Sequence, residues 1–153
     1  MRQLTAADRA LVLSHHLALS EEDRVLRFGS GVSDEQLRKY VDGLDFSRDC
    51  CFGFFDETGR LLGFVQVSPS GERTAEVALS VAPDSRGRGL GHKLLQQATR
   101  HCGNRGIKEF VLYYMRPNRA MGQLAARLGM AIKASGRDVE ACLSLDSHSV
   151  TSG

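Results

Sequence analysis

The sequence has no long run of apolar residues and no excess of charge of one sign. None of its apolar runs approaches the roughly 20 residues that a membrane-spanning helix needs. Its 20 basic and 18 acidic residues leave a net charge of +2, which gives no general attraction to nucleic acid or to a membrane surface. The first residues include polar side chains throughout and form no signal-peptide core, so we expect a cytoplasmic protein. Any anion-binding site must come from charges and backbone groups gathered locally.

Cysteine is scarce, and its spacing is unsuited to a metal site. The four cysteines are Cys50, Cys51, Cys102 and Cys142, and no two of them have the Cys-x-x-Cys spacing that is typical of zinc sites. The adjacent pair is also poorly suited to a disulfide framework. We expect reduced, mostly buried cysteines that act as small hydrophobic residues, and no bound metal.

The length of 153 residues and the hydrophobic share of 42% favour one domain with a substantial core. No repeat or linker divides the chain. We expect this domain to occupy residues 1–146 and to be followed by a small, polar, disordered tail over residues 147–153.

Local patterns predict helices first and strands afterwards. Thr5 and Ser33 are each followed, three residues later, by an acid or amide side chain, as in a helix capping box, and Ser20 begins a further acidic turn. The β-prone runs 51–55, 61–67 and 74–81 then predict an antiparallel meander. A helix over 90–102, a strand over 109–114, a helix over 117–128 and a closing strand pair over 131–133 and 139–145 complete the chain. The order predicts an α+β or mixed α/β fold, with parallel strands where 74–81 and 109–114 flank a helix.

A glycine-rich turn joins two of these elements. The stretch VAPDSRGRGLGHK, residues 81–93, follows an expected strand and opens an expected helix. Backbone N–H groups and the helix dipole make such a turn an anion site, and glycine lets a phosphate approach closely. Arg86, Arg88 and Lys93 add full positive charges, so a pyrophosphate is the natural ligand. The alternative is a solvent-exposed turn that carries solubilising arginines.

The glycine spacing excludes two common phosphate motifs. A dinucleotide fingerprint beginning at Gly87 would need a third glycine where His92 stands, and a nucleotide P-loop would need Ser or Thr after Lys93. The spacing that remains is Arg-x-x-Gly-x-Gly, formed by Arg86, Gly89 and Gly91.

This spacing resembles the acetyl-CoA loop of the GNAT superfamily of N-acetyltransferases. A second signature, formed by Asn118, Met121, Leu124, Ala125, Gly129 and Met130, resembles the penultimate helix of that superfamily. The resemblance implies a central mixed, mostly antiparallel sheet of six or seven strands flanked by helices in α/β/α layers. It also implies transfer of the acetyl group of acetyl-CoA to a primary amine by direct attack.

The resemblance also implies a cofactor site. Leu79, Ser80 and Val81 are expected to hold the pantetheine arm and the acetyl carbonyl, and Asn118 is expected to hydrogen-bond the same arm. The pyrophosphate site is expected to comprise the following eight residues: Arg86, Gly87, Arg88, Gly89, Leu90, Gly91, His92 and Lys93.

The reaction needs a base that deprotonates the amine and a proton source for the departing thiolate. Only a neutral amine can attack, and a lysine-like amine is less than about 0.1% neutral at pH 7, so a carboxylate is needed to take its proton directly or through water. Glu76 is the candidate base, and its alternative role is that of a solvated cross-strand partner.

Ala125 occupies the position where the superfamily often has a tyrosine that protonates the departing thiolate. The thiolate then leaves unassisted or takes its proton from water, or from Tyr113 or Tyr114.

The acceptor is left open. The segment 19–28 resembles the start of the GNAT domains of bacterial protein lysine acetyltransferases, which favours protein lysine. The acids at the helix starts that follow Ser20 and Ser33, from Glu21 to Asp23 and at Asp34 and Glu35, either attract a cationic acceptor or cap their helices. A small amine such as a polyamine, an amino acid or an antibiotic is the alternative acceptor. The alternative function is that of a non-catalytic acyl-CoA sensor or of a nucleotide-binding domain.

No nucleic acid or membrane partner is expected, and both a monomer and a homodimer are compatible with the sequence.

Overall fold

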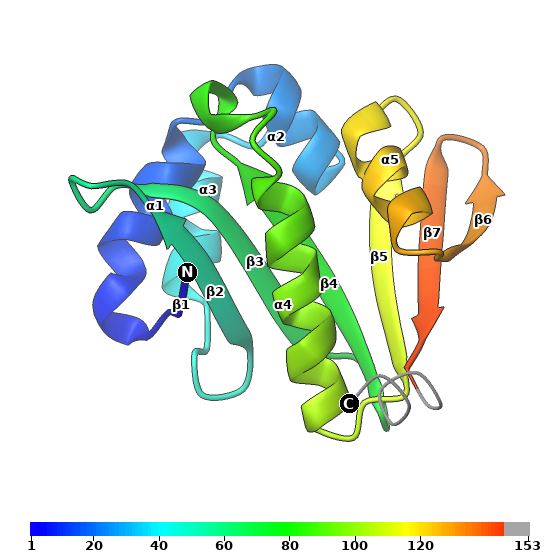
Figure 1. Cartoon of the computed structure of the whole chain (residues 1–153). Helices are drawn as coiled ribbons and strands as arrows, with labels where there is room; N and C mark the ends of the chain where they lie inside the picture. The colour runs from blue at the N-terminus through cyan, green and yellow to red at the C-terminus, as the bar shows by residue number, and fades with distance from the viewer. Residues whose placement is uncertain (146–153) are drawn as a thin grey trace.

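The computed structural model describes residues 1–145, and the predicted tail over 147–153 lies outside them (Figure 1). The elements, in chain order, are β1 (Arg2–Gln3), the 3-10 turn η1 (Ala6–Asp8), α1 (Arg9–Leu17), α2 (Glu21–Phe28), α3 (Asp34–Asp42), β2 (Cys50–Phe55), β3 (Leu61–Pro69), β4 (Thr74–Val81), the 3-10 turn η2 (Pro83–Ser85), α4 (Leu90–Asn104), β5 (Glu109–Met115), α5 (Arg119–Arg127), β6 (Ala131–Ser135) and β7 (Asp138–Ser144).

Three helices begin with a side chain that caps their first free N–H groups. Ser20 accepts a hydrogen bond from the third residue of α2, Ser33 forms a complete capping box at α3, and Asn118 caps α5. The helix α4 differs, because its N-cap is Gly89, which has no side chain to offer. Within residues 1–145, the first N–H groups of α4 therefore have neither a helical partner nor a side-chain cap.

The sheet has seven strands in the order β1-β2-β3-β4-β5-β7-β6. The strands β2, β3 and β4 form the predicted antiparallel meander, and β5, β7 and β6 are also antiparallel. The two halves meet at β4 and β5, which are parallel because α4 carries the chain back between them. The predicted mixed, mostly antiparallel sheet of six or seven strands is confirmed.

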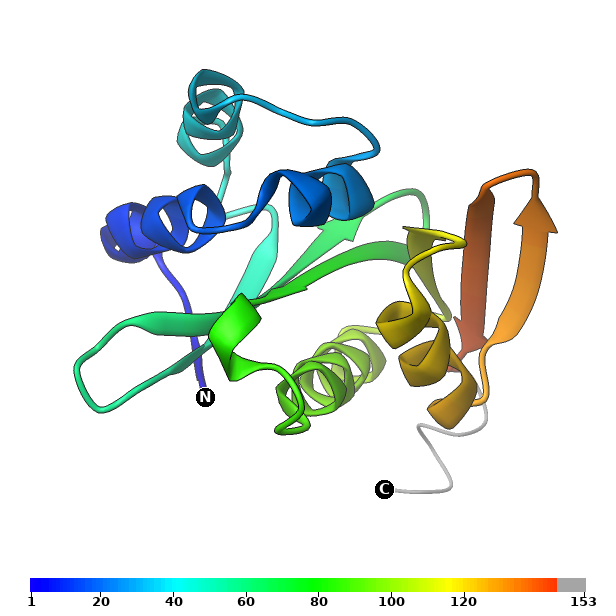
Figure 2. The same ribbon diagram turned by 90° about the horizontal axis from the view of Figure 1, so that it is seen from above.

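Helices cover both faces of the sheet (Figure 2). The helices α1, α2 and α3 lie on one face, and α4 and α5 lie on the other. The main core lies under α4 and α5 and includes Val77, Leu79, Leu94, Phe110 and Leu112, each at most 5% exposed. Side chains of β4 therefore alternate between this core and the side of α1 to α3.

The pairing between β4 and β5 covers only the first half of β4. It begins at Thr74 with Glu109 and ends at Val77 with Leu112. Beyond that point Ala78 to Val81 have no partner on β5, so the two strands separate towards their C-terminal ends. Their unpaired backbone groups face the gap between them, where they can bond a ligand.

Two features differ from the sequence-based expectation. The chain opens with a short strand, β1, that pairs with Phe52 and Gly53 at the edge of the sheet, whereas only a helix start was predicted there. Of the four cysteines, Cys51 and Cys102 are buried, but Cys50 and Cys142 are only partly so, and all four are free thiols. Over residues 1–145, no helix is both long and apolar enough to cross a membrane.

Candidate functional site

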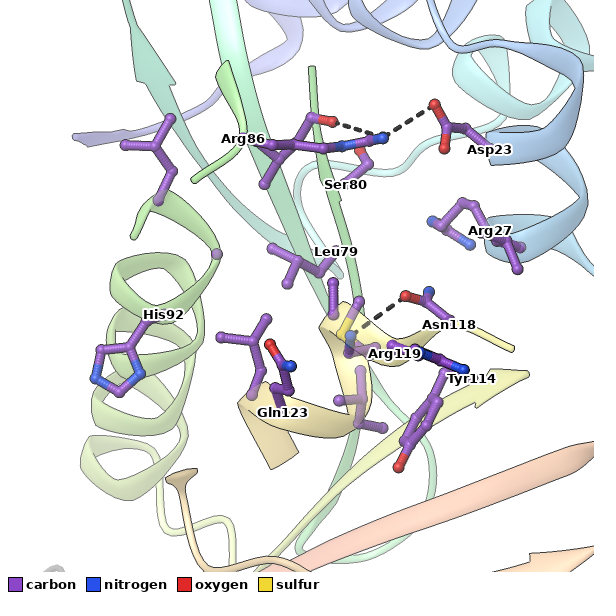
Figure 3. A pocket seen from close by; sticks show the side chains of 18 of the residues that line it. Asp23, Arg27, Leu79, Ser80, Arg86, His92, Tyr114, Asn118, Arg119 and Gln123 are labelled. Carbon is purple, nitrogen blue, oxygen red and sulfur yellow. Dashed lines mark hydrogen bonds and ion pairs between the residues drawn. The ribbon is translucent and has the colours of Figure 1, made fainter. Parts of the chain in front are cut away.

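A cleft with a volume of about 540 Å³ opens where β4 and β5 separate. Its lining comes from five places: the half of β4 that does not pair with β5, the C-terminal half of β5, the glycine turn and first turn of α4, the helix α5, and one side of α2. Figure 3 shows these side chains gathered around the space, with α2 facing the strands and α5. The cleft is the place where the free N–H groups of α4 and the free edges of the two strands meet.

The glycine turn shapes the end of the cleft nearest α4. Gly87 and Gly89 have φ angles of 79° and 76°, in the left-handed region that favours glycine, and open space surrounds the position where a Cβ would lie. Gly91 is required for a different reason. A Cβ there would lie 3.1 Å from Leu124 Cδ1, so the missing side chain lets α4 pack closely against α5.

Arg86 begins this turn and reaches across the cleft. Its Nη2 lies 2.9 Å from Asp23 Oδ2 on α2 and donates a 3.3 Å hydrogen bond to the Val81 carbonyl oxygen (Figure 3). The guanidinium is about half exposed, so the pair lies within reach of solvent. A bound pyrophosphate, which carries two negative charges, would offer Arg86 a stronger partner at the same place.

The side-chain amide of Asn118 has an oxygen that caps a helix and a nitrogen that can donate to a ligand. Its Oδ1 accepts the N–H of Met121 at 3.2 Å and so caps α5. Its Nδ2 group is left to donate to a ligand in the cleft. The predicted contact with a pantetheine arm therefore fits the cap geometry, although the cap itself is not visible in the sequence motif.

Most of the predicted cofactor residues line the cleft. They are Leu79, Ser80, Val81, Arg86, Gly87, Gly89, Leu90, Gly91, His92 and Asn118. Arg88 and Lys93 are exposed and do not line it. These two side chains contribute charge from the rim of the loop, and their contact with a ligand stays a prediction.

Glu76 lies just outside the cleft lining. It is exposed, sits opposite Ser68 on β3 and Val111 on β5, and precedes by two residues Ala78, which lines the cleft on the same strand face. The Glu76 charge is one of the causes that raise the pKa of Tyr113, a cleft residue, so the carboxylate is close to the wall of the site. Because Glu76 does not line the cleft itself, a water molecule or the incoming amine must bridge the distance between its carboxylate and the cleft.

Three residues were considered in connection with the proton that the departing thiolate takes: Ala125, Tyr113 and Tyr114. Ala125 is fully buried in the core and offers no proton donor. Tyr113 and Tyr114 both line the cleft. The Tyr113 hydroxyl donates a 3.1 Å hydrogen bond to Glu140, and this bond raises the pKa of Tyr113, so the phenol is protonated at neutral pH. Tyr114 packs partly against the core.

The α2 wall contains residues that were not assigned to the site from sequence. Asp23 was considered only as one of several acids at helix starts, and Arg27 was given no role, yet both line the cleft. The N-cap at Ser20 gives a partial signal, because it places Asp23 and Arg27 one turn apart on one helix face. Which face meets the sheet depends on how α2 docks.

The arrangement fits a long anionic ligand with an extended arm. The open amides of α4 and Arg86 suit a pyrophosphate, and the unpaired strand edges and the Asn118 amide suit an amide-rich arm such as pantetheine. In residues 1–145, no group of three or more His, Cys, Asp or Glu side chains is arranged to hold a metal ion.

Known proteins match this chain by family and by fold. The model of the acetyltransferase (GNAT) family matches residues 15–130. No curated protein sequence matches the chain.

Several solved structures share the fold. The GNAT domain of PAT from S. lividans has a TM-score of 0.79 and 22% identity, over 94% of this chain and 89% of that one. A GNAT superfamily phosphinothricin acetyltransferase from Sinorhizobium meliloti, solved with acetyl-CoA, has a TM-score of 0.75 and 16% identity, over 94% and 86%. Mutant forms of the spermidine/spermine N-acetyltransferase SpeG from Vibrio cholerae give 0.70 and 18%, over 99% and 96%.

Proposed function

The chain belongs to the acetyltransferase (GNAT) family, and we propose that it acetylates a primary amine that attacks the acetyl group directly. It is an N-acetyltransferase that uses acetyl-CoA as its cosubstrate. The observation that carries the proposal is the glycine-capped start of α4 beside the point where β4 and β5 separate.

The residues of the cleft divide the work of binding. The N–H groups at the start of α4 and the Arg86 guanidinium would hold the pyrophosphate, and the rim charges of Arg88 and Lys93 would add to this attraction. The edge of β4 from Leu79 to Val81, which has no strand partner on the β5 side, and the Asn118 amide would hold the pantetheine arm. When bound, acetyl-CoA supplies a thioester whose acetyl group forms a bond to the amine nitrogen as the bond to sulfur breaks.

Glu76 is proposed as the general base. An ammonium ion has no lone pair, so its proton must leave before attack, and a carboxylate can accept it directly or through one water. The position of Glu76 on the same strand face as Ala78, next to the cleft, supports this role. The alternative role, that of an exposed cross-strand residue, predicts no effect of its removal on turnover.

The departing thiolate needs no dedicated acid in this proposal. Ala125 provides none, and a CoA thiolate is a stable enough leaving group to depart and take its proton from water. The Tyr113 hydroxyl is engaged with Glu140, which makes it a poor donor towards the cleft.

The acceptor class has two candidates. The resemblance of segment 19–28 to the start of protein lysine acetyltransferase domains supports protein lysine. The similar structures include enzymes named for a polyamine and for phosphinothricin, which supports a small amine.

The test is release of free thiol from acetyl-CoA in the presence of amines. The panel comprises amino acids, polyamines and a lysine peptide with blocked ends. Turnover of any amine supports acetyl transfer. Calorimetric binding of CoA without turnover of any amine would instead support a non-catalytic acyl-CoA sensor.

A further inference from the structure

Arg27 brings a guanidinium group to the wall of the cleft opposite the cofactor loop. It lies on α2, one helical turn after Asp23, and both residues line the cleft. Figure 3 shows Arg27 reaching from α2 into the space between Asp23 and Asn118. This wall belongs to the helices on the other face of the sheet from α4, so Arg27 faces the cleft from the side opposite the cofactor loop.

The guanidinium has no carboxylate partner in residues 1–145. Its Nη2 donates a 3.1 Å hydrogen bond to the Tyr40 hydroxyl, and its Nε is buried without any acceptor. A buried N–H group on a charged side chain without a partner costs free energy. The guanidinium therefore has donors without a protein acceptor in the described part of the chain, and an oxyanion in the cleft would supply one where the group faces the space.

A partly buried hydrogen-bonded network holds the guanidinium in place. The Tyr40 hydroxyl, which accepts from Arg27, donates in turn to Gln66 Oε1. The Gln66 amide then donates to Asp49 Oδ2 at 2.7 Å, and the Asp49 side chain is only 4% exposed. Phe28 packs against the guanidinium, with its ring centre 4.4 Å from Cζ. One edge of Arg27 is thus fixed, and the remaining donors are preorganised for a ligand.

The charges around the cleft leave Arg27 without local compensation. The lining contains one carboxylate, Asp23, and that group is paired with Arg86. The other guanidinium groups of the lining, on Arg86, Arg119 and Arg127, come from the cofactor loop and from α5. Asp49, the nearest acid in the network, is separated from Arg27 by Tyr40 and Gln66.

We propose that Arg27 binds an anionic group of the acceptor, and that the acceptor is a small amine carrying a carboxylate or a comparable oxyanion. The inference rests on the proposed function, because it needs the amine to enter from the α2 side. A planar guanidinium binds such a group with two parallel hydrogen bonds, which also orients the amine. A polyamine would place positive charge against Arg27, and a lone lysine side chain would leave the guanidinium unused.

The test compares amines that differ only in the carboxylate. L-Lysine and cadaverine form one such pair, and L-phenylalanine and 2-phenylethylamine form another. The amino acid of a pair is expected to react with the higher kcat/KM in the wild-type enzyme. Arg27→Met, which keeps the length and apolar packing of the side chain, is expected to raise KM for the amino acid about tenfold to hundredfold and to leave kcat nearly unchanged. The same variant is expected to change KM for the carboxylate-free amine little.

Two further variants test whether the effect of Arg27→Met comes from the lost hydrogen-bond geometry, from the lost charge or from misfolding. Arg27→Lys keeps the charge but loses the fork, and it is expected to recover only part of the affinity. Arg38→Met removes an exposed arginine of α3 that has no role in the cleft, and it is expected to behave as wild type. Far-UV circular dichroism and acetyl-CoA affinity report whether each variant is folded.

Binding provides a readout that does not need turnover. Calorimetry of the common amino acids with CoA-saturated protein is expected to find at least one that binds and whose binding is lost in Arg27→Met. Equal kinetics for both members of every pair would overturn the proposal and leave acetyl transfer intact. A loss of acetyl-CoA affinity in Arg27→Met, or the absence of any amino acid that binds, would also overturn it.

Discussion

Arg86 on the cofactor loop and Asp23 on α2 form an ion pair, with Nη2 and Oδ2 2.9 Å apart across the cleft. The pair joins the site of the expected pyrophosphate to the helix that carries Arg27. A bound phosphate and Asp23 therefore compete for one guanidinium group.

Asp23→Asn is expected to strengthen acetyl-CoA binding. The change removes the competing carboxylate and one negative charge near the phosphates. Partly exposed ion pairs contribute up to about 1 kcal/mol, so the gain should reach at most about fivefold in Kd by calorimetry. Asp34→Asn is the control, because Asp34 pairs with Arg24 and does not line the cleft. Weaker binding in Asp23→Asn would mean that the pair supports the loop.

Gly91→Ala is expected to lower both stability and acetyl-CoA affinity. The new Cβ would meet Leu124 Cδ1 at 3.1 Å, so the Leu124 side chain must give way by a few tenths of an ångström between α4 and α5, at a cost of about 1 kcal/mol or more in unfolding free energy. Urea unfolding and calorimetry measure the two effects. Gly122→Ala is the matched control in α5, since its Cβ would make only ordinary contacts at 3.7 Å or more. That variant should be neutral or slightly stabilised, and an equal loss in both would contradict the crowding argument.

Asn118→Asp separates the cap from the ligand contact. An aspartate retains an oxygen that caps α5, so thermal stability should change little. It loses the Nδ2 donor, so acetyl-CoA should bind about fivefold to tenfold more weakly. Ser33→Ala is the complementary control, because it removes the cap of α3 and Ser33 does not line the cleft. It should lower Tm without changing affinity, and unchanged affinity in Asn118→Asp would remove Asn118 from the cofactor site.

Buried His15 predicts a loss of stability in mild acid. Burial lowers the pKa of His15 to about 4, and the nearby Arg60 charge adds to this effect. In the unfolded chain the imidazole titrates near 6.5, so the unfolded state binds more protons between the two values and stability falls as pH drops. His15 alone should account for about 2 kcal/mol between pH 7 and pH 5.

His15→Gln tests this origin, because an amide can also contact the Leu61 carbonyl oxygen and the Ser80 hydroxyl, which lie 3.2 and 2.8 Å from the ring nitrogens. Urea unfolding at the two pH values should show a smaller drop in the variant. An unchanged drop would assign the effect to other groups, of which buried His16 is the first candidate, since burial lowers its pKa to about 3.

Local sequence signals predicted the parts of the site that depend on local geometry. The left-handed glycines at 87 and 89 follow from backbone rules that act over a few residues. The parallel pairing of β4 and β5 follows from the helix between them. These features were therefore visible before the structure.

Long-range packing determines the parts that were missed. Asp23 and Arg27 meet the cleft only because α2 docks beside β4 and β5, and the sequence contains no local sign of that contact. The short strand β1 likewise forms only because β2 offers it an edge. The network from Arg27 to Asp49 joins residues 22 positions apart through α3 and β3, beyond the reach of periodicity.

The turnover of Glu76→Gln, measured beside its affinity for acetyl-CoA, tests the central claim most directly. The amide keeps the size of the side chain but cannot take the proton of an ammonium ion. With a reactive amine, kcat should fall about 10²- to 10⁴-fold at pH 7, and the Kd for acetyl-CoA by calorimetry should stay close to that of the wild type. Wild-type turnover in Glu76→Gln would contradict the role of Glu76 as the base.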